Sequence, residues 1–391
     1  TLDDVSNAFS GTVTFSTDSG SAVTVVDTTA LDLLALSAAS LSVTAGGAVT
    51  DSGTLAVSGA TTISASGQDI TLDEAASTFG ALALTGANVA VTENAATDLA
   101  ASTVSGTLGI TSAGAVTDSG TLAITGATTI SASGQDITLD EAASTFGTLA
   151  LTGSNVAVTE NAAMDLGAST IGGTANFNST SNVITDSGTL AITGATTINA
   201  GTADITLDQA ASTFGALALT GANVAVTENA ATDLAASTVS GTLGVTSTGA
   251  VTDSGTLAIT GATTISASGQ DITLDEAAST FGTLALTGAN VAVTENAATD
   301  LGASTVSGTF GITSGGAITD SGTQTITGAA TFTNTAGTND AITLDDVSNA
   351  FSGTVTFSTD SGSAVTVVDT TALDLLALTA ASLSVTAGGA V

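Results

Sequence analysis

The sequence repeats itself about every 67 residues, and this period constrains the fold more than any single residue does. Residues 343–391 also repeat residues 1–49, with Thr379 in place of Ser37 as the one difference. Tandem copies of this length predict a repeat architecture. The copies are marked by the aspartates of two motifs. Thr-Asp-Ser-Gly-Thr contains Asp51, Asp118, Asp186, Asp253 and Asp320, and Thr-Leu-Asp contains Asp3, Asp73, Asp140, Asp208, Asp275 and Asp345.

A shorter period divides each copy. The segments that begin at Asp73 and Asp98 align with each other over about 25 residues, and a third, shorter segment follows at Gly120. We therefore expect about three coils per copy, averaging about 22 residues each. Apolar residues alternate with small or polar ones inside each coil, which indicates short strands. The alternating pairs include Ile70/Leu72, Leu82/Leu84, Val89/Val91 and Leu108/Ile110.

A coil of this length is too short to fold alone, so each coil must stack on its neighbours. Stacked coils pair their strands in parallel, and the absence of proline suits a continuous ladder of hydrogen bonds. The sequence thus predicts an all-β fold, a parallel β-helix or β-solenoid. Two alternatives remain open: tandem immunoglobulin-like sandwiches, one per copy of the repeat, and a helix over residues 29–42, where leucines cluster.

We expect one continuous β-solenoid over residues 1–391, built from the tandem copies as its units. The last unit is partial and repeats residues 1–49. The chain begins and ends inside repeat motifs, and no signal peptide is visible, so we expect it to be part of a longer polypeptide. The expected units are 1–68, 69–135, 136–203, 204–270, 271–339 and 340–391.

The third copy departs from the pattern in a way that predicts its packing. Ala175 and Phe177 stand where the second copy has Leu108 and Ile110, so one position loses volume and the position two residues on gains it. Residues two apart share a face of a strand, and we expect both side chains in one packed core. One extra residue enters between Asn178 and Asn182, where we expect a turn.

Composition excludes most chemistry. The chain has no Lys, Arg, His or Cys, and its 35 carboxylates give a formal charge of −35. Nucleophile activation, phosphate binding, zinc sites and iron–sulfur sites need the missing residues. Nucleic acid and anionic lipid repel such a polyanion, and no apolar run is long enough to span a bilayer. We expect no enzyme, no catalytic, cofactor-binding or metal-binding residues, and no cofactor.

Calcium is the one metal ion that the carboxylate and hydroxyl groups of this composition could bind. In the 25-residue alignment Glu93 corresponds to Asp118, and Asp73 to Asp98, so stacking in that register places like charges together. A bridging cation would then stiffen the molecule. The alternative is that these are solvated turn residues that cap their own backbone. The recurring positions are Glu93, Glu160, Glu228 and Glu295; Asp98, Asp165, Asp233 and Asp300; and Asp73, Asp140, Asp208 and Asp275.

Three other features have simple structural interpretations. A phenylalanine recurs once per copy, and we expect it to fill the core or cover it. Threonine is scattered over several strand types, which disfavours a regular ice-binding face. One acceptor sequence for N-glycosylation, Asn178-Ser-Thr180, is expected by chance in a chain so rich in threonine. The recurring phenylalanines are Phe79, Phe146, Phe214 and Phe281.

Two segments show a resemblance to a known family, and in composition and period the resemblance covers essentially the whole chain. The run Leu-Ser-Val-Thr-Ala-Gly-Gly-Ala-Val-Thr-Asp-Ser-Gly-Thr-Leu at 41–55 resembles the repeats of bacterial filamentous haemagglutinin-type proteins and of large β-strand-repeat surface proteins. So does Asp-Ile-Thr-Leu-Asp with a following Phe-Gly. The resemblance implies an exported, right-handed β-helix with a role in adhesion or matrix formation. The amino-terminal secretion domain of such proteins is not in this chain.

These features predict a structural repeat segment of a long extracellular fibre or biofilm filament at the cell surface. The alternative is the stalk of an adhesin whose ligand-binding region lies outside this segment. Because the closing coils repeat the opening ones, we expect head-to-tail association, so the partner is this chain itself or the rest of a longer chain. A host or matrix ligand is not identified by the sequence.

The first prediction concerns secondary structure and shape. Circular dichroism should show strand with almost no helix, because no segment has a sustained helical period. Small-angle scattering should show an elongated particle, because stacked coils rise by about 4.8 Å each. A compact globule, or substantial helix, would contradict the solenoid.

Overall fold

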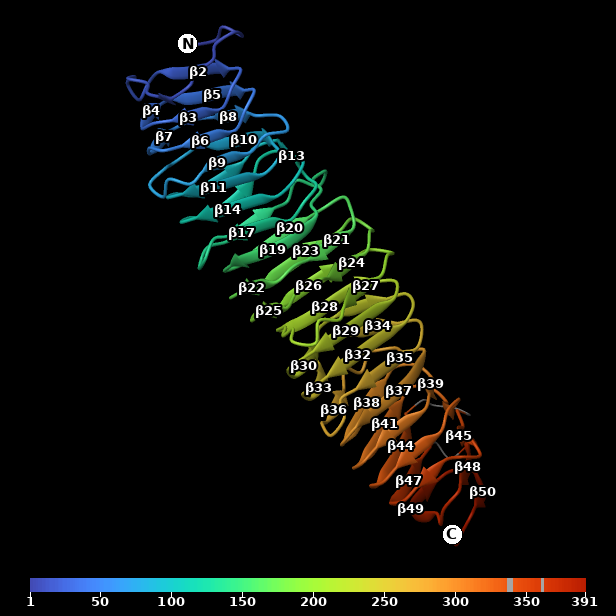
Figure 1. The fold of residues 1–391 in the computed structure, drawn as a ribbon. Helices are drawn as coiled ribbons and strands as arrows, with labels where there is room; N and C mark the ends of the chain where they lie inside the picture. Colours follow the sequence, from blue (N-terminus) through green and yellow to red (C-terminus); the bar gives the residue numbers. More distant parts are fainter. Residues whose placement is uncertain (336–339, 360–361) are drawn as a thin grey trace. The chain divides into compact units, whose positions relative to one another are not determined.

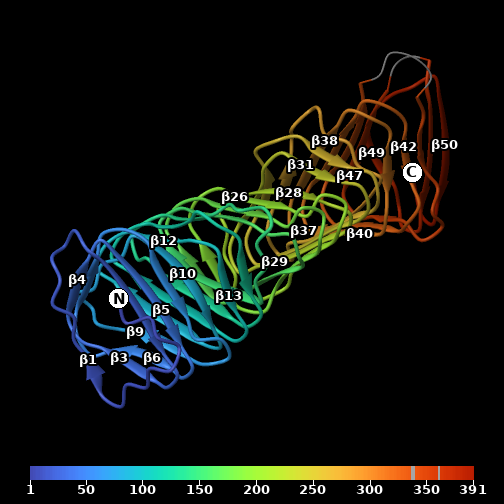
Figure 2. The same ribbon diagram turned by 90° about the horizontal axis from the view of Figure 1, so that it is seen from above.

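The computed structural model describes residues 1–335, 340–359 and 362–391, and the regular structure in that part of the chain is all β-strand. The chain divides into two compact units, Thr1–Gly194 and Ala195–Val391. Each unit by itself is a parallel β-solenoid, in which short strands of successive turns lie side by side (Figures 1 and 2). The expected boundary at 339/340 falls beside residues 336–339, which lie outside the described residues.

Both alternatives to the solenoid are wrong. Residues 29–42 contain β3 (Leu31–Leu33) and β4 (Leu36–Ala38) and the start of β5 (Ser40–Ala45), not a helix. The parallel pairing of turn upon turn also rules out separate sandwiches. None of the described residues forms a helix long and apolar enough to cross a membrane.

One copy of the repeat illustrates the strand order. In the first unit it comprises β10 (Ala81–Gly86), β11 (Val89–Glu93), β12 (Thr97–Leu99), β13 (Ser102–Val104), β14 (Leu108–Ser112), β15 (Val116–Asp118), β16 (Leu122–Ile124), β17 (Thr128–Ser131) and β18 (Ile137–Leu139). The matching strands of the second unit are β28 (Ala216–Gly221), β29 (Val224–Glu228), β30 (Thr232–Leu234), β31 (Ser237–Val239), β32 (Leu243–Ser247), β33 (Val251–Asp253), β34 (Leu257–Ile259), β35 (Thr263–Ser266) and β36 (Ile272–Leu274).

The core is formed by the inward-facing residues of each strand. In β10, Leu82 and Leu84 are buried while Ala83 between them is partly exposed, as the alternation predicts. Inward residues stack on inward residues of the next turn, and one column runs through Val91, Ile110, Ile130 and Leu151. Burying these aliphatic side chains contributes about 25 cal/mol per Å² of apolar surface, which makes stacking the main source of stability.

The irregular third copy is packed as expected. Ala175 and Phe177 both face inward on β23 (Ala175–Asn178) and are 2% and 0% exposed, so they share the core volume of one face. The extra residue lies in the following turn, where Thr180 and Ser181 have φ values of 48° and 77°. This left-handed backbone is uncommon outside glycine, so the insertion has a local conformational cost.

The repeat does not contain a whole number of turns. Strands β12, β13 and β14 lie beside β15, β16 and β17, which makes three strand segments per turn. The long strand β10 pairs with both β12 and β13, so its turn has only two segments. Four pairing steps lead from β10 through β12, β15 and β18 to β20 (Val156–Thr159), and three lead from β11 through β14 and β17 to β19 (Thr148–Gly153). Because β19 and β20 are the first two strands of the next copy, each copy makes about three and a half turns, close to the three expected. The 25-residue register is wrong, because Val89 pairs with Leu108 and Leu108 pairs with Thr128.

The extra half turn moves each copy to the other side of the solenoid. In the first unit β8 (Thr61–Ser64) pairs with β5 and β10 in one sheet. Its sequence equivalent β17 pairs with β14 and β19 (Thr148–Gly153) in the other sheet. The change of side takes place where one long strand pairs with two short strands of the next turn. Leu82 of β10 pairs with Leu99 of β12, and Gly86 pairs with Val104 of β13.

The second prediction tests the core column. Ile130→Ala should lower the free energy of unfolding by roughly 2–5 kcal/mol, because Ile130 is 1% exposed and stacked on both sides. The neighbouring Thr129→Ala, on the outward face of the same strand, should change it by less than about 0.5 kcal/mol. Urea unfolding of the two variants measures both. Equal losses would mean that the inward and outward assignments of β17 are wrong.

Candidate functional site

The most polar recurring structure is a loop with the sequence Asp-Glu-Ala-Ala-Ser-Thr-Phe. We call it the acidic loop; it spans residues 73–79, 140–146 and 275–281, and residues 208–214 with Gln209 in place of glutamate. A turn closes it, with the Ser77 N–H donating to the Glu74 carbonyl at 2.8 Å. In the loops at 73–79, 140–146 and 275–281 the pairing with the preceding turn is reduced from a strand to a single β-bridge, such as Ala123 with Thr145. The loop backbone therefore needs partners that a strand ladder does not supply.

An aspartate from the preceding turn supplies the first of these partners. Asp118 accepts the N–H groups of Asp140 at 2.8 Å and Glu141 at 3.3 Å. The loop serine completes the contact, since the Ser144 Oγ accepts the Leu122 N–H at 3.0 Å. The same arrangement recurs at Asp51 in the first unit and at Asp253 in the second. This aspartate is the one in the Thr-Asp-Ser-Gly-Thr motif.

A glutamate from the following turn supplies the second partner. Its Oε1 accepts the backbone N–H of the loop phenylalanine, and its side chain is no more than 2% exposed. The pairs are Glu93 with Phe79 at 2.7 Å, Glu160 with Phe146 at 2.6 Å, Glu228 with Phe214 at 2.8 Å, and Glu295 with Phe281 at 2.7 Å. Two motif carboxylates thus hold the two ends of each such loop.

One natural variant shows that these contacts serve the backbone. In residues 345–351 an asparagine replaces the loop serine, and the Asn349 Oδ1 accepts the Gln324 N–H at 2.7 Å. Asn349 Nδ2 donates to Asp320 at 2.6 Å, and Asp369 accepts the Phe351 N–H at 3.2 Å in place of a glutamate. Different side chains at these positions preserve the same backbone hydrogen bonds, as expected of a structural role.

Burial disfavours the charged form of these carboxyls. It raises the pKa of Glu160 and Glu295 to about 7 and that of Asp51 to about 6. It also raises the pKa of Glu93, Glu228, Asp118, Asp253 and Asp320, and hydrogen bonds from the loop backbone oppose the shift. No cationic side chain exists to stabilise the charged forms.

The carboxylates expected to stack on each other do not do so. Glu93 pairs with Ser112, and Asp98 pairs with Thr117 and Ala81, because a turn here is shorter than the aligned segments. Two members of the Asp98 series have hydroxyl partners: the Asp165 Oδ2 accepts from Thr148 and Ser187, and the Asp300 Oδ2 accepts from Thr283 and Ser321 at 2.9 Å each. The described residues contain no group of three or more His, Cys, Asp or Glu arranged for a metal ion.

The recurring phenylalanines are buried, as expected. Phe79, Phe146, Phe214 and Phe281 are 6–7% exposed. The backbone roles of Asp118 and Glu93 were not anticipated from the sequence. The signal was available, because Asp118 precedes its loop by 22 residues and Glu93 follows its phenylalanine by 14, and both spacings recur.

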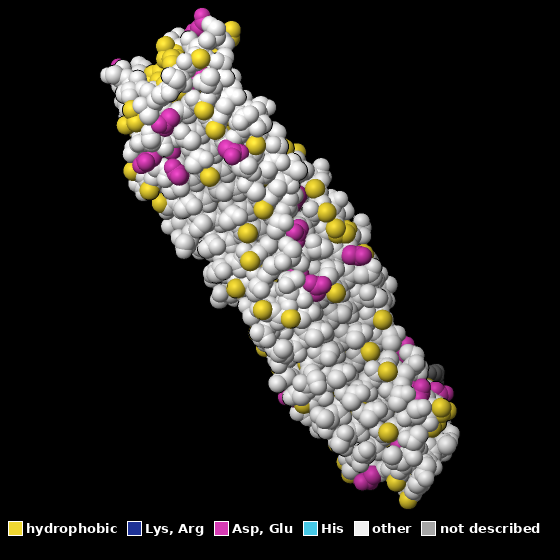
Figure 3. All heavy atoms as spheres, viewed as in Figure 1, with side chains coloured by type: hydrophobic (Ala, Val, Ile, Leu, Met, Phe, Trp, Pro, Cys, Tyr) yellow, Lys and Arg dark blue, Asp and Glu magenta, His cyan; other side chains and the backbone are white. Residues whose placement is uncertain are grey.

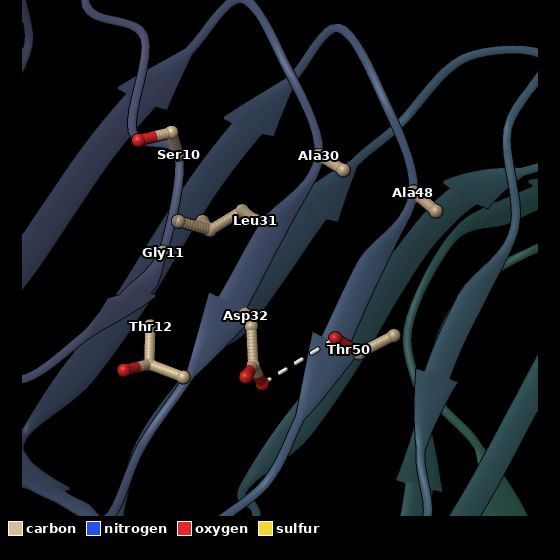
Figure 4. Close-up of a pocket in the computed structure, with 8 residues that line it drawn as sticks. All are labelled: Ser10, Gly11, Thr12, Ala30, Leu31, Asp32, Ala48 and Thr50. Atoms are coloured by element: carbon tan, nitrogen blue, oxygen red, sulfur yellow. Dashed lines mark hydrogen bonds between the residues drawn. The ribbon is translucent and has the colours of Figure 1, made fainter.

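On the face of the described residues seen in Figure 3, acidic side chains lie in small separate groups and not in one concentrated patch. A hollow of about 290 Å³ lies beside β1 (Thr12–Val13) and β3, lined by Ser10, Gly11, Thr12, Ala30, Leu31, Asp32, Ala48 and Thr50 (Figure 4). Its single carboxylate, Asp32, accepts a long hydrogen bond of 3.4 Å from Thr50. Glycoside hydrolases generally use a pair of carboxyl groups, whereas the lining of this hollow contains one.

This geometry defines a tandem-repeat β-solenoid protein in which carboxyl side chains complete the backbone hydrogen bonding. The chain belongs to the family described as repeats of unknown function (DUF5649), whose model matches residues 20–85, 86–152, 153–220, 221–287 and 288–358. No curated protein and no solved structure matches the chain. The five matches follow one another with the same period that the sequence shows.

The third prediction tests the aspartate of the loop. Asp118→Ala should lower the free energy of unfolding by about 1–3 kcal/mol, because the N–H groups of Asp140 and Glu141 lose their acceptor. Hydrogen exchange of those amides should accelerate. Asp118→Asn keeps one acceptor oxygen, so its free energy of unfolding should fall by less than that of Asp118→Ala. Unchanged exchange in Asp118→Ala would mean that the carboxylate does not hold the loop.

Proposed function

We propose that the chain is a structural repeat segment of a long extracellular fibre or surface filament and that it has no catalytic activity. One observation carries the proposal. The buried carboxyl groups, which would be the reactive groups of such a chain, recur in copy after copy, where they accept hydrogen bonds from loop backbone. An active site is a single constellation that differs from its surroundings, and repetition of a structural contact supports a scaffold instead.

The dependence of each turn on its neighbours supports a filament. Residues 343–358 form β46 (Ala350–Phe351) and β47 (Thr354–Ser358) where they lie on an earlier turn, and Phe357 is 1% exposed. Stacking of this kind has no inherent end, since each added copy offers the surface that the next one needs.

The resemblance to filamentous haemagglutinin-type repeats supports an exported location at the cell surface. The absence of cysteine is compatible with an oxidising environment. The partner is the chain itself or the remainder of a longer chain, and the polyanionic character argues against nucleic acid. The second candidate is the stalk of an adhesin, which the same repeats would suit and whose ligand would bind outside this segment.

We propose further that the fold requires no bound cation. The carboxylates expected to face each other lie opposite hydroxyl or small side chains instead. Chelation should therefore leave the melting temperature unchanged, whereas loss of a bound ion would lower it. Thermal unfolding with and without a calcium chelator is the fourth prediction, and a fall of many degrees would contradict it.

Immunoelectron microscopy of the producing cells tests the location. Antibodies raised against the repeat should label intact cells or extracellular filaments, with label spaced along the filaments. A cytoplasmic protein labelled only after permeabilisation is the control. Label confined to permeabilised cells would overturn the extracellular role, and label confined to the base of a separate tip structure would favour the adhesin stalk.

A further inference from the structure

A chain of hydrogen bonds continues from the buried glutamate on the side away from the acidic loop. In the second unit the Glu295 Oε2 lies 2.8 Å from the Thr299 Oγ1, which lies 3.0 Å from the Ser314 Oγ. Ser314 donates to the carbonyl of Ala297 at 2.8 Å and accepts the N–H of Gly316 at 3.2 Å. Glu295, Thr299 and Ser314 are all at most 2% exposed.

Counting the hydroxyl hydrogens along this series of hydrogen bonds assigns the protonation state of Glu295. The Ser314 hydroxyl hydrogen goes to the Ala297 carbonyl, so the Thr299–Ser314 contact must use the hydroxyl hydrogen of Thr299. Thr299 then has no hydrogen left for Glu295. The 2.8 Å contact between Thr299 and Glu295 is a hydrogen bond only if Glu295 carries a proton on Oε2 and donates it. The Oε1 remains free to accept the Phe281 N–H.

The other copies lead to the same assignment. Thr97 contacts Ser112 at 3.0 Å and Ser112 donates to Ala95 at 2.9 Å, and the matching distances at Thr232, Ser247 and Ala230 are 3.0 and 2.7 Å. The threonine hydrogen is again committed to serine. The Oε2 atoms of Glu93 and Glu228 are buried and have no donor. An ionised oxygen in that position would bear the full cost of desolvation.

The third copy lacks the threonine altogether. Met164 takes its place, and the Oε2 of Glu160 is buried without a partner while the residue is 0% exposed. A carboxylate there would have one side-chain hydrogen bond, from the Phe146 N–H to Oε1, and a buried second oxygen without a partner. The neutral acid is the form that this site can accommodate at low cost.

The charged groups around Glu295 leave this assignment intact. Glu295 ends β38 (Val291–Glu295), which lies between β36 and β41 (Phe310–Ser314), and neither of those strands contains a titratable residue. The nearby titratable groups are Asp275 and Glu276 of the acidic loop and Asp300 of β39 (Thr299–Leu301). All three are acids, so none can stabilise a negative charge on Glu295.

We infer that the buried glutamates Glu93, Glu160, Glu228 and Glu295 are neutral acids in the folded solenoid, and that their ionisation is a pH switch that loosens the acidic loops. Each glutamate joins the loop phenylalanine to the interior of the next turn. In Glu93, Glu160 and Glu228 a charge on the buried Oε2 has no hydrogen-bond donor, and in Glu295 it gains one only if Thr299 gives up its hydrogen bond to Ser314. Ionisation therefore favours opening of that contact to water.

The sign of the effect follows from the direction of the pKa shifts. The unfolded glutamate has a pKa of 4.5, and burial raises the folded pKa of Glu160 and Glu295 to about 7. The folded state therefore binds more protons between these values. The stabilisation is fully present below pH 4.5 and is lost as pH rises through about 7. The solenoid should be more stable at pH 5 than at pH 8, which is the reverse of ordinary acid denaturation.

The fifth prediction compares the full chain with two variants between pH 5 and pH 8. In the wild type the melting temperature should fall by several degrees as pH rises. In the Glu93→Gln, Glu160→Gln, Glu228→Gln, Glu295→Gln variant it should fall much less, because an amide accepts from phenylalanine and keeps a donor at any pH. The control Asp374→Asn removes an exposed charge outside the acidic loops and should keep the wild-type slope.

Infrared spectroscopy gives a direct readout that does not depend on the fourfold variant folding. At pH 6 the wild type should show the carbonyl band of protonated carboxylic acids, and single Glu295→Gln should reduce it. Loss of that band in the wild type above pH 8, together with faster hydrogen exchange at Phe146 and Phe281, would support the switch. A wild-type spectrum with only carboxylate bands at pH 6, or a melting temperature that rises toward pH 8, would overturn it.

Discussion

Every turn of a parallel stack must offer its backbone N–H and C=O groups to the turns on either side, and the rest of this structure depends on that requirement. Regular strands meet it with a ladder, as β11 does against β9 (Ile70–Leu72) and β14. A repeat of three and a half turns cannot meet it everywhere, because one side of the solenoid must lose a strand while another gains one. The acidic loop lies where the ladder fails.

Side-chain carboxyls take over the hydrogen bonds that the ladder cannot make at that point. Asp118 accepts the N–H of Asp140 at the beginning of the loop, and Glu160 accepts the N–H of Phe146 at its end. Two recurring carboxyl groups from different turns thus act on one short segment. Hydroxyl or amide side chains such as Ser144 and Asn349 complete the pattern. This division of roles explains why acidic residues persist at buried positions in a chain without cations.

Burial of these carboxyls has an electrostatic consequence that the formal charge of −35 conceals. Self-repulsion among 35 charges would destabilise the compact state. Burial raises the pKa of the loop-binding glutamates and aspartates, which is the direction that lowers this charge. With the buried glutamates neutral, as we infer, the same contacts that complete the backbone reduce the charge of the folded molecule and make its stability depend on protons.

The sequence by itself determined the period of the repeat, the strands, and which residues of each strand face the core. Alternation in Leu82/Leu84 and the paired change to Ala175 and Phe177 both follow from the two-residue period of a strand, which is a local property. The register was decided only by the tertiary structure. Aligning similar segments placed Glu93 over Asp118, but stacking follows the circumference of a turn and places it over Ser112. Segments that look alike in sequence lie on different sides of the solenoid because three and a half turns separate the copies, and the partners of Phe79 and Asp73 depend on that geometry.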